Sequence, residues 1–296
     1  MKWKRNTGFD QIEDRRGQGG GGLGGALGGG GGGIPIPIPG GRTGGGIGGI
    51  IISIILFLLV SGVLGGGMPS LGGLGGGGAA QPGGTLDPQS DTDQQLAYIV
   101  NDIQTFWAST FKAAGRDYPE TKLVLFEGGT SSSCGPASAA TGPFYCPADQ
   151  KVYLDLGFFD ELRSRFGAQG GDFAMAYVVA HEFGHHVQNA LGIAERVQQT
   201  SQQDPSQQNA LSVRMELQAD CLAGVWSHAA ATDLQPGDID EALSAASAVG
   251  DDRIQQSTSG RVDPESWTHG SAEQRVAWFT KGYQSGSSDD CDTFAQ

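Results

Sequence analysis

Apolar residues recur at helical or strand spacing only in the later part of this chain of 296 residues. The clearest helical pattern covers residues 91–113, where apolar side chains return every three or four positions and Gly115 follows. The same spacing predicts further helices over about 172–191, 207–231, 239–247 and 272–281. We expect Asp172 to cap the first of these and Gly192 to end it.

Two short runs have the composition and alternation of strands. They are residues 122–127 (KLVLFE) and 151–156 (KVYLDL), and in the second run Val152 and Leu154 share one face. The stretch 128–149 between them is rich in Ser, Gly, Cys and Pro and is predicted to be a loop. A small sheet followed by several helices predicts an α+β domain, mainly helical, over residues 91–296.

One apolar run stands apart from this domain. Residues 47–64 hold no charge, and 18 residues of helix would span roughly 27 Å, close to a bilayer core. A buried core helix fits less well, because the flanks are glycine tracts with little to pack against it. A cleaved signal peptide also fits less well, because the run begins far from Met1, although Ala79–Ala80 offers a weak cleavage site. We therefore expect a single transmembrane helix.

Glycine and charge divide the chain at the same place. Of the 51 glycines, 33 precede residue 85, which predicts a disordered Gly-rich tail over 1–46 and a flexible linker over 65–90. All six Lys/Arg of residues 1–84 precede the apolar run, so positive-inside bias places the N-terminus in the cytoplasm and the domain outside, in the periplasm or extracellular space. The domain is acidic, with 12 Lys/Arg and 29 Asp/Glu in residues 85–296, which argues against nucleic acid as a partner.

The four cysteines all lie in the part expected outside the cytoplasm: Cys134, Cys146, Cys221 and Cys291. An even number in an oxidising compartment predicts two disulfides. Three pairings are possible, and the spacing favours Cys134 with Cys146 and Cys221 with Cys291. No C-x-x-C occurs, which argues against a cysteine zinc site.

Candidate chemistry concentrates in HEFGHH, residues 181–186. His181 and His185 are four apart on a predicted helix, so both imidazoles can bind one Zn²⁺, while Glu182 is placed to reach a water. This is the H-E-x-x-H signature of zinc peptidases. The alternative is a helix whose histidines have no shared role. This alternative is weaker, because a chain of this composition would rarely contain the H-E-x-x-H pattern by chance. His186 falls off the ligand face.

A catalytic zinc site needs a third protein ligand and an open position. The segment RMELQADCLAGVW, residues 214–226, places Glu216 and Asp220 four apart on one predicted helix, amid apolar residues. Buried carboxylates are costly unless a metal and its imidazole ligands neutralise them. We therefore predict Glu216 as the third ligand and Asp220 as the hydrogen-bond partner of a ligand histidine. The alternative is a solvated carboxylate pair.

These segments resemble a known family. E-x-x-x-D after H-E-x-x-H resembles the gluzincin pattern, and GFDQIEDRRG, YCPADQKVYLDLGFFDEL, AHEFGHHVQ, ELQADCLAGVW and THGSAEQRVAWFTKG resemble the bacterial "putative neutral zinc metallopeptidase" family. The resemblance covers the N-terminal tip and nearly all of residues 92–283. It implies a single-pass membrane protein with a zincin-like domain, in which His181, His185 and Glu216 bind zinc and Glu182 is catalytic. It implies no substrate.

The segment THGSAEQR adds two further candidates. His269 and Arg275 stand six apart, and a similar H-x5-R pair lies beside the metal in membrane zinc peptidases of the gluzincin type. The resemblance implies that His269 stabilises the oxyanion and that Arg275 holds His269 or an Asp such as Asp220. The alternative places His269 in an ordinary cap region of the last helix.

The sequence thus favours a membrane-anchored peptidase with one Zn²⁺, acting on peptide or protein substrates outside the cytoplasm. Glu182 would take a proton from water and pass it to the leaving amine, and His269 would donate to the oxyanion. We also hypothesise that strand 151–156 is a sheet edge that pairs with an extended peptide.

Two other readings stay open. One is a catalytically silent zincin-fold binding or scaffold protein, against which the intact Glu182 weighs. The other is a purely structural zinc site, which would need a fourth protein ligand such as His269.

Overall fold

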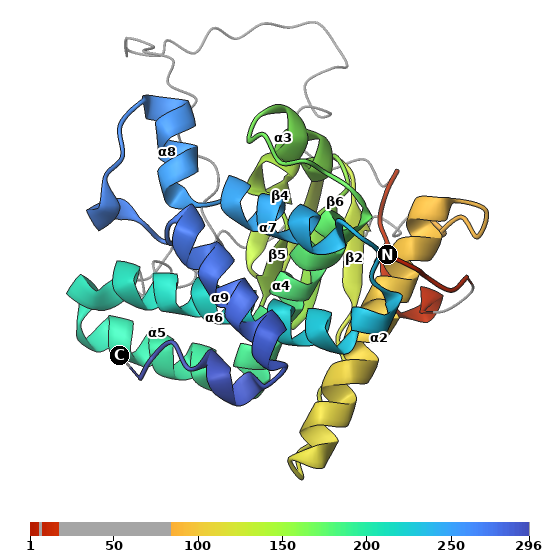
Figure 1. Cartoon of the computed structure of the whole chain (residues 1–296), viewed down its shortest axis with the longest axis horizontal. Coiled ribbons are helices and arrows are strands. Elements are labelled where there is room, and N and C mark those ends of the chain that lie inside the picture. Colours follow the sequence, from red (N-terminus) through yellow and green to blue (C-terminus); the bar gives the residue numbers. More distant parts are fainter. Residues whose placement is uncertain (6–7, 18–83, 296) are drawn as a thin grey trace, which may run out of the picture.

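The computed structural model describes residues 1–5, 8–17 and 84–295. It contains a four-stranded mixed sheet covered by helices (Figure 1). The strand order is β1-β2-β6-β5. Strands β1, β2 and β6 run parallel, and β5 pairs with β6 in the antiparallel direction. The strands are β1 (Ile12–Asp14), β2 (Leu123–Phe126), β5 (Phe144–Cys146) and β6 (Lys151–Asp155).

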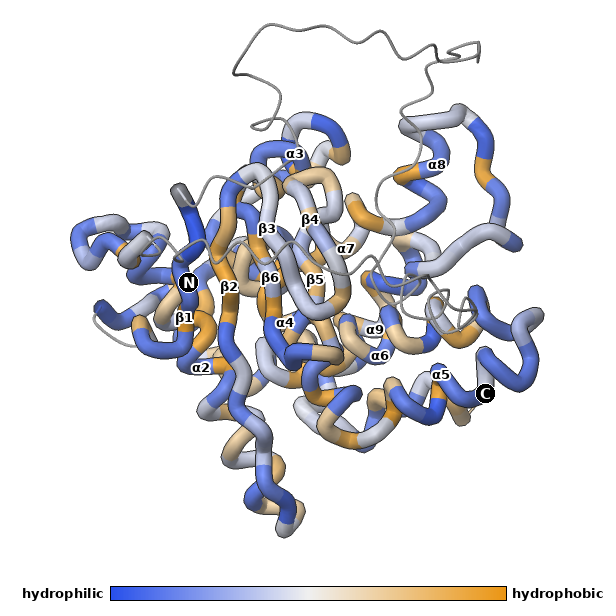
Figure 2. The backbone as a smooth tube through the Cα atoms, turned by 180° about the vertical axis from the view of Figure 1, so that it is seen from behind, coloured by the Kyte–Doolittle hydropathy of each residue, from blue (hydrophilic) through white to orange (hydrophobic). Residues whose placement is uncertain are grey.

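The two faces of the sheet pack against different layers, because successive side chains of a strand point to opposite faces. Leu123, Leu125, Val152 and Leu154 join the main core with the helices. Figure 2 shows a hairpin over the other face, built from β3 (Gly129–Ser132) and β4 (Gly135–Ser138). The small core on that side consists of Val124, Phe126, Cys134, Ala137, Phe144, Cys146 and Tyr153.

The predicted helices are present, with ends within about three or four residues of the predictions. They are α2 (Asp91–Ala113), α4 (Asp172–Ala190), α6 (Gln208–Ala229), α7 (Asp238–Ala248) and α9 (Ala272–Ser285). Gly192 follows α4 with a φ of 70°, a left-handed conformation that glycine adopts at little cost. The predicted cap at Asp172 is wrong: its side chain makes no cap bond, and the backbone N–H of Phe173 donates to the Glu241 carboxylate of α7 instead.

Several short elements were not predicted. The expected loop 128–149 contains β3, β4 and β5. These strands are too short to show an alternating pattern, and β3 and β4 are also rich in Gly and Ser. The hypothesis that strand 151–156 is an edge is wrong, because β6 lies between β2 and β5, and β5 is the edge on that side. The other unpredicted elements are α3 (Phe158–Ser164), α5 (Ile193–Gln203), α8 (Asp251–Ser259) and the 3₁₀ turns Phe9–Gln11, Ala139–Thr141, Pro205–Gln207, Ala231–Asp233, Pro264–Ser266 and Ser288–Cys291.

Two disulfides have the favoured pairing. Cys134 is bonded to Cys146, which ties the tip of the β3–β4 hairpin to β5. Cys221 is bonded to Cys291, which ties α6 to the C-terminal segment. Both therefore support elements that the site uses.

Helices α6 and α9 approach each other backbone to backbone. A Cβ atom on Gly224 would lie 2.1 Å from the carbonyl oxygen of Phe279, and one on Gly282 would lie 2.0 Å from that of Cys221. Only glycine fits at either position without moving a helix. This close contact brings Arg275 of α9 beside Asp220 of α6.

The first residues of the chain differ from the expected disordered tail over 1–46. Residues 12–14 form β1 and pair with β2, so the start of the chain belongs to the sheet. The predicted transmembrane helix at 47–64 lies outside the described residues. Among the residues that are described, none of the helices is long and apolar enough to cross a bilayer.

Candidate active site and metal centre

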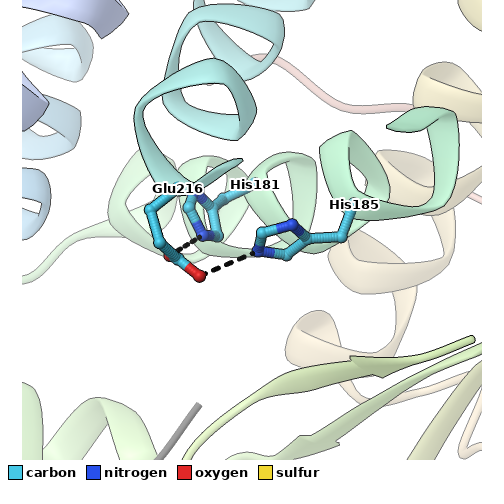
Figure 3. A group of neighbouring side chains, drawn as sticks. All are labelled: His181, His185 and Glu216. Carbon is cyan, nitrogen blue, oxygen red and sulfur yellow. Dashed lines mark hydrogen bonds and ion pairs between the residues drawn. The ribbon is translucent and has the colours of Figure 1, made fainter. Parts of the chain in front are cut away.

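Three buried side chains from two helices converge at one point (Figure 3). Helix α4 contributes His181 and His185, and α6 contributes Glu216. The Nε2 atom of His181 lies 3.2 Å from Oε2 of Glu216, and that of His185 lies 3.5 Å from Oε1. One ligand atom from each residue lies within 4.8 Å of the other two, which is a spacing that one cation can bridge.

The other nitrogen of each imidazole is engaged elsewhere. Nδ1 of His181 donates to Asp220 over 2.9 Å, and Nδ1 of His185 donates to the amide oxygen of Gln188 over 2.8 Å. Donation from Nδ1 leaves a lone pair on Nε2, which is the nitrogen that faces Glu216. Both rings are therefore oriented as metal ligands.

The structure places Asp220 beside His181, the position expected for it, and adds Gln188 beside His185. Gln188 is itself fixed, because its amide N–H donates to the carbonyl of Met215 over 2.7 Å and to Gln218 over 3.0 Å. Sequence reasoning missed Gln188. The signal that could have found it is its position three residues after His185 on the same helix.

Arg275 contacts Asp220 rather than His269, the alternative that the resemblance left open. Its Nε and Nη2 donate to the two carboxylate oxygens over 2.8 and 3.0 Å, and Tyr177 donates its hydroxyl to the same carboxylate over 2.6 Å. Burial raises the pKa of Asp220, but Arg275 and His181 outweigh it and lower the pKa to about 2. Tyr177, which is buried and was not predicted, completes this support for His181.

His269 lies in the same cavity and is held by Asp251, the first residue of α8. One oxygen of the Asp251 carboxylate accepts from Nδ1 of His269 over 3.1 Å. The other accepts from the backbone N–H groups of Thr268, His269 and Gly270 over 2.8, 2.6 and 3.0 Å. Asp251 therefore fixes both the loop and the ring, and leaves Nε2 of His269 available to a ligand.

The cavity is lined by both polar and apolar residues. The polar lining comes from His181, Glu182, His185, Glu216, His269 and Arg275. The apolar lining comes from Phe144, Phe158, Val178 and Val249. Phe144 and its neighbour Tyr145 belong to β5, so an edge strand of the sheet runs along the cavity.

Glu182 is nearly buried, and burial raises its pKa to about 7. The backbone N–H of Tyr145 donates to its carboxylate, which opposes that rise. A carboxylate with a pKa near neutrality can both accept and release a proton under ordinary conditions. Glu182 thus has the environment of a general base.

The part of the site formed by His181, His185 and Glu216 favours positive charge. Burial lowers the pKa of His181, but the carboxylates of Asp220 and Glu216 more than offset this and raise it to about 10. Burial lowers the pKa of His185 to about 4, which keeps this imidazole neutral. The pKa of Glu216 stays below its usual range, because the nearby histidines outweigh the effect of burial. A proton or a divalent cation between these groups is therefore stabilised.

The donor set fits zinc. Two imidazole nitrogens and one carboxylate form the three-ligand set of catalytic zinc sites, whereas Ca²⁺ and Mg²⁺ prefer oxygen donors alone. His269 is held by Asp251 and is not part of this three-residue group.

The remaining two histidines lie outside the group. His186 is buried, donates from Nε2 to the carbonyl of Pro119 and accepts at Nδ1 from the Tyr145 hydroxyl. His228 contacts the carbonyl of Tyr283. Neither is positioned for a role in the cavity.

Comparison with known proteins shows the family of this chain. The sequence matches the family described as "Putative neutral zinc metallopeptidase" over residues 1–294. The chain belongs to this family. It is 42% identical to "Uncharacterized protein YpfJ" of Escherichia coli (strain K12) over 302 aligned residues, covering 100% of this chain and 99% of that protein.

Mycobacterial relatives match a shorter part. "Uncharacterized protein Mb2605" of Mycobacterium bovis and "Uncharacterized protein Rv2575" of Mycobacterium tuberculosis (strain H37Rv) are each 52% identical over 190 residues, covering 60% of this chain and 64% of each relative. No solved structure matches the chain significantly. The family therefore rests on sequence, and the geometry of the site rests on the structure described above.

Proposed function

We propose that this protein is a zinc-dependent peptidase whose active site is the cavity around His181, His185 and Glu216. The observation that carries this proposal is the convergence of these three buried donors from α4 and α6, with Glu182 beside them. A purely structural site normally has four protein ligands. Here the three donors border a cavity, which leaves room for a substrate.

The residues around the donors have separate tasks. A zinc ion held by them would supply Lewis-acid polarisation of a carbonyl and make a water more acidic. Glu182 would take a proton from an attacking water and pass it to the leaving amine, because its pKa of about 7 allows both directions of transfer. Asp220 and Gln188 keep the imidazoles of His181 and His185 in the orientation that binding requires.

His269 would stabilise the negative charge that develops on the substrate oxygen. Its Nδ1 is occupied by Asp251, so donation to substrate has to come from Nε2. A hydrogen bond that forms fully only as charge develops lowers the barrier more than it strengthens substrate binding.

The substrate backbone would pair with β5. Among the described strands this three-residue strand pairs with β6 alone, and its residues Phe144 and Tyr145 line the cavity. The N–H of Tyr145 already donates to Glu182, so a substrate would pair with the other main-chain groups at this edge. An extended peptide can add to such an edge by main-chain hydrogen bonds. β5 therefore replaces strand 151–156 in this role.

We further propose that the domain acts outside the cytoplasm, attached to a membrane through the apolar run 47–64. The two disulfides support this, because such bonds persist in oxidising compartments. The 18 uncharged residues of the run support attachment to lipid.

The test is cleavage of an unbiased peptide library by the full-length protein, with zinc present and after chelation, alongside Glu182→Gln. We expect zinc-dependent cleavage by the natural chain, and for Glu182→Gln full zinc binding with cleavage reduced roughly 100-fold or more. Equal cleavage by both proteins would contradict the role of Glu182. Zinc binding without any cleavage by the natural chain would favour the catalytically silent alternative.

A further inference from the structure

Residues 12–14 near the start of the chain form β1, which belongs to the same sheet as β5 beside the cavity. The backbone register pairs Ile12 with Leu123, Glu13 with Val124 and Asp14 with Leu125 in a parallel ladder. The N–H of Arg15 extends it by donating to the carbonyl of Leu125 over 2.7 Å. Ile12 is buried in the main core, so β1 contributes side chains as well as backbone.

Arg16 then ties this strand to the first helix of the domain. Its guanidinium lies 2.8 Å from Asp14 and 2.7 Å from Asp93, which sits in the first turn of α2 and is buried. Asp93 also accepts from the backbone N–H of Asp87 over 2.9 Å. Arg16 thus links β1 to α2, and Asp93 links α2 to the segment before it.

The described residues on either side of 18–83 lie close together beside Arg16. A Cβ atom on Gly84 would lie 3.0 Å from the carbonyl oxygen of Arg16 and 3.0 Å from the Asp14 carboxyl group. Arg16 and Gly84, on either side of residues 18–83, therefore lie next to each other.

Contacts before β1 hold the start of the chain against α2 again and also against α7. A Cβ on Gly8 would lie 2.2 Å from the carbonyl oxygen of Ala97, so this residue lies directly on α2. The N–H of Lys2 donates to the carbonyl of Asp233 over 2.6 Å, and the amino group of Met1 pairs with Asp238 of α7 over 2.9 Å. The described N-terminal residues are attached to the domain along their length.

We infer that residues 1–5 and 8–17 are a structural part of the peptidase domain and lie on the same side of any membrane as residues 84–295. Strands that share a ladder lie roughly 4.8 Å apart, whereas a bilayer core is about 30 Å thick. The orientation expected from the basic flanks, with the N-terminus and the domain on opposite sides, is incompatible with this sheet. The parts of the chain before and after the run 47–64 then lie on one side of the membrane, which is the side of the domain.

The test of this topology uses two single substitutions in the full-length chain, Asp10→Cys and Lys112→Cys. Both positions are exposed, and all four natural cysteines are in disulfides, so each variant presents one free thiol. The probe is a membrane-impermeant maleimide on intact bacterial cells whose outer envelope admits it, with permeabilised cells as the control. We expect both thiols to react in intact cells, or both only after permeabilisation. Reaction of one thiol in intact cells and of the other only after permeabilisation would overturn the inference.

A second measurement tests whether the N-terminal residues belong to the folded domain. Arg16→Ala removes the arginine that joins β1 to α2. The control, Arg5→Ala, is also in the N-terminal residues and removes an exposed ion pair with Asp91. We expect Arg16→Ala to lower the melting temperature by on the order of 5 °C and Arg5→Ala to leave it nearly unchanged. Equal melting temperatures for the two variants would overturn the inference. Neither test depends on peptidase activity, so this inference stands or fails separately from the proposed function.

Discussion

The carboxylate of Asp251 contacts His269 twice, through Nδ1 of the ring and through the backbone N–H. A neutral imidazole that keeps its proton on Nδ1 has none on Nε2. Donation from Nε2 to a substrate therefore requires the protonated ring. Burial lowers the pKa of His269, but Asp251 and Glu216 outweigh this and raise it above its ordinary value.

Asp251→Asn should therefore move the alkaline limit of activity to lower pH. In the natural chain, His269 stays protonated below its raised pKa, and kcat/KM falls as pH rises through that value. The substitution removes the charge that raises the pKa, so the fall begins nearer neutrality. The measurement is kcat/KM against pH for both proteins, and coincident alkaline limbs would contradict the role of Asp251 as the positioning residue for His269.

The acid limit of activity should reflect Glu182. Burial raises the pKa of this carboxyl group to about 7, and only the carboxylate can accept a proton. We expect kcat/KM to fall as pH falls below about 7. His185 does not explain such a limb, because its pKa is lowered to about 4. A profile that stays flat from pH 8 to pH 5 would rule out Glu182 as a base with a raised pKa.

Gln188→Ala should weaken zinc binding without removing a ligand. The change deletes the acceptor that orients His185, and loss of such a partner typically costs roughly 10- to 100-fold in metal affinity. The matched control is Asn189→Ala, because the side chain of this next residue donates to the Tyr145 hydroxyl and not to a ligand imidazole. A competition titration with a chelator measures both affinities, and equal values for the two variants would show that Gln188 has no such role.

Arg275→Ala should be strongly destabilising, because it leaves the buried Asp220 without its bidentate partner. Breaking a buried pair costs about 3–5 kcal/mol of unfolding free energy. Arg163→Ala removes an exposed pair with Asp160 and should change the free energy by about 1 kcal/mol or less. Urea unfolding of both variants provides the comparison, and similar midpoints would contradict the structural weight given to Arg275.

Sequence patterns predicted the elements whose own residues carry a periodic signal. The helices over 91–113 and 172–191 are long enough to show apolar spacing, and H-E-x-x-H marks its own helix face. Glu216 and Asp220 could be found because two carboxylates four apart stand among apolar residues. The α+β class followed from these elements.

The features that sequence reasoning missed depend on partners far away in the chain. Strand β5 has three residues, which are too few for an alternating pattern. Because β5 was not predicted, the hypothesis placed β6 at the edge of the sheet, where β5 lies instead. Asp251 resembles any acidic residue at a helix start until the fold brings His269 to it. β1 is equally short, and its pairing with β2 joins residues more than 100 positions apart.

The proposed zinc centre is tested most directly by anomalous diffraction from crystals of the full-length protein grown with zinc, which locates the ion and its ligands. We expect one ion bound to Nε2 of His181, Nε2 of His185 and a carboxylate oxygen of Glu216, with bond lengths of about 2.0–2.2 Å. Zinc at another location, or an ion at the two histidines with the Glu216 carboxylate turned away, would contradict the proposed centre.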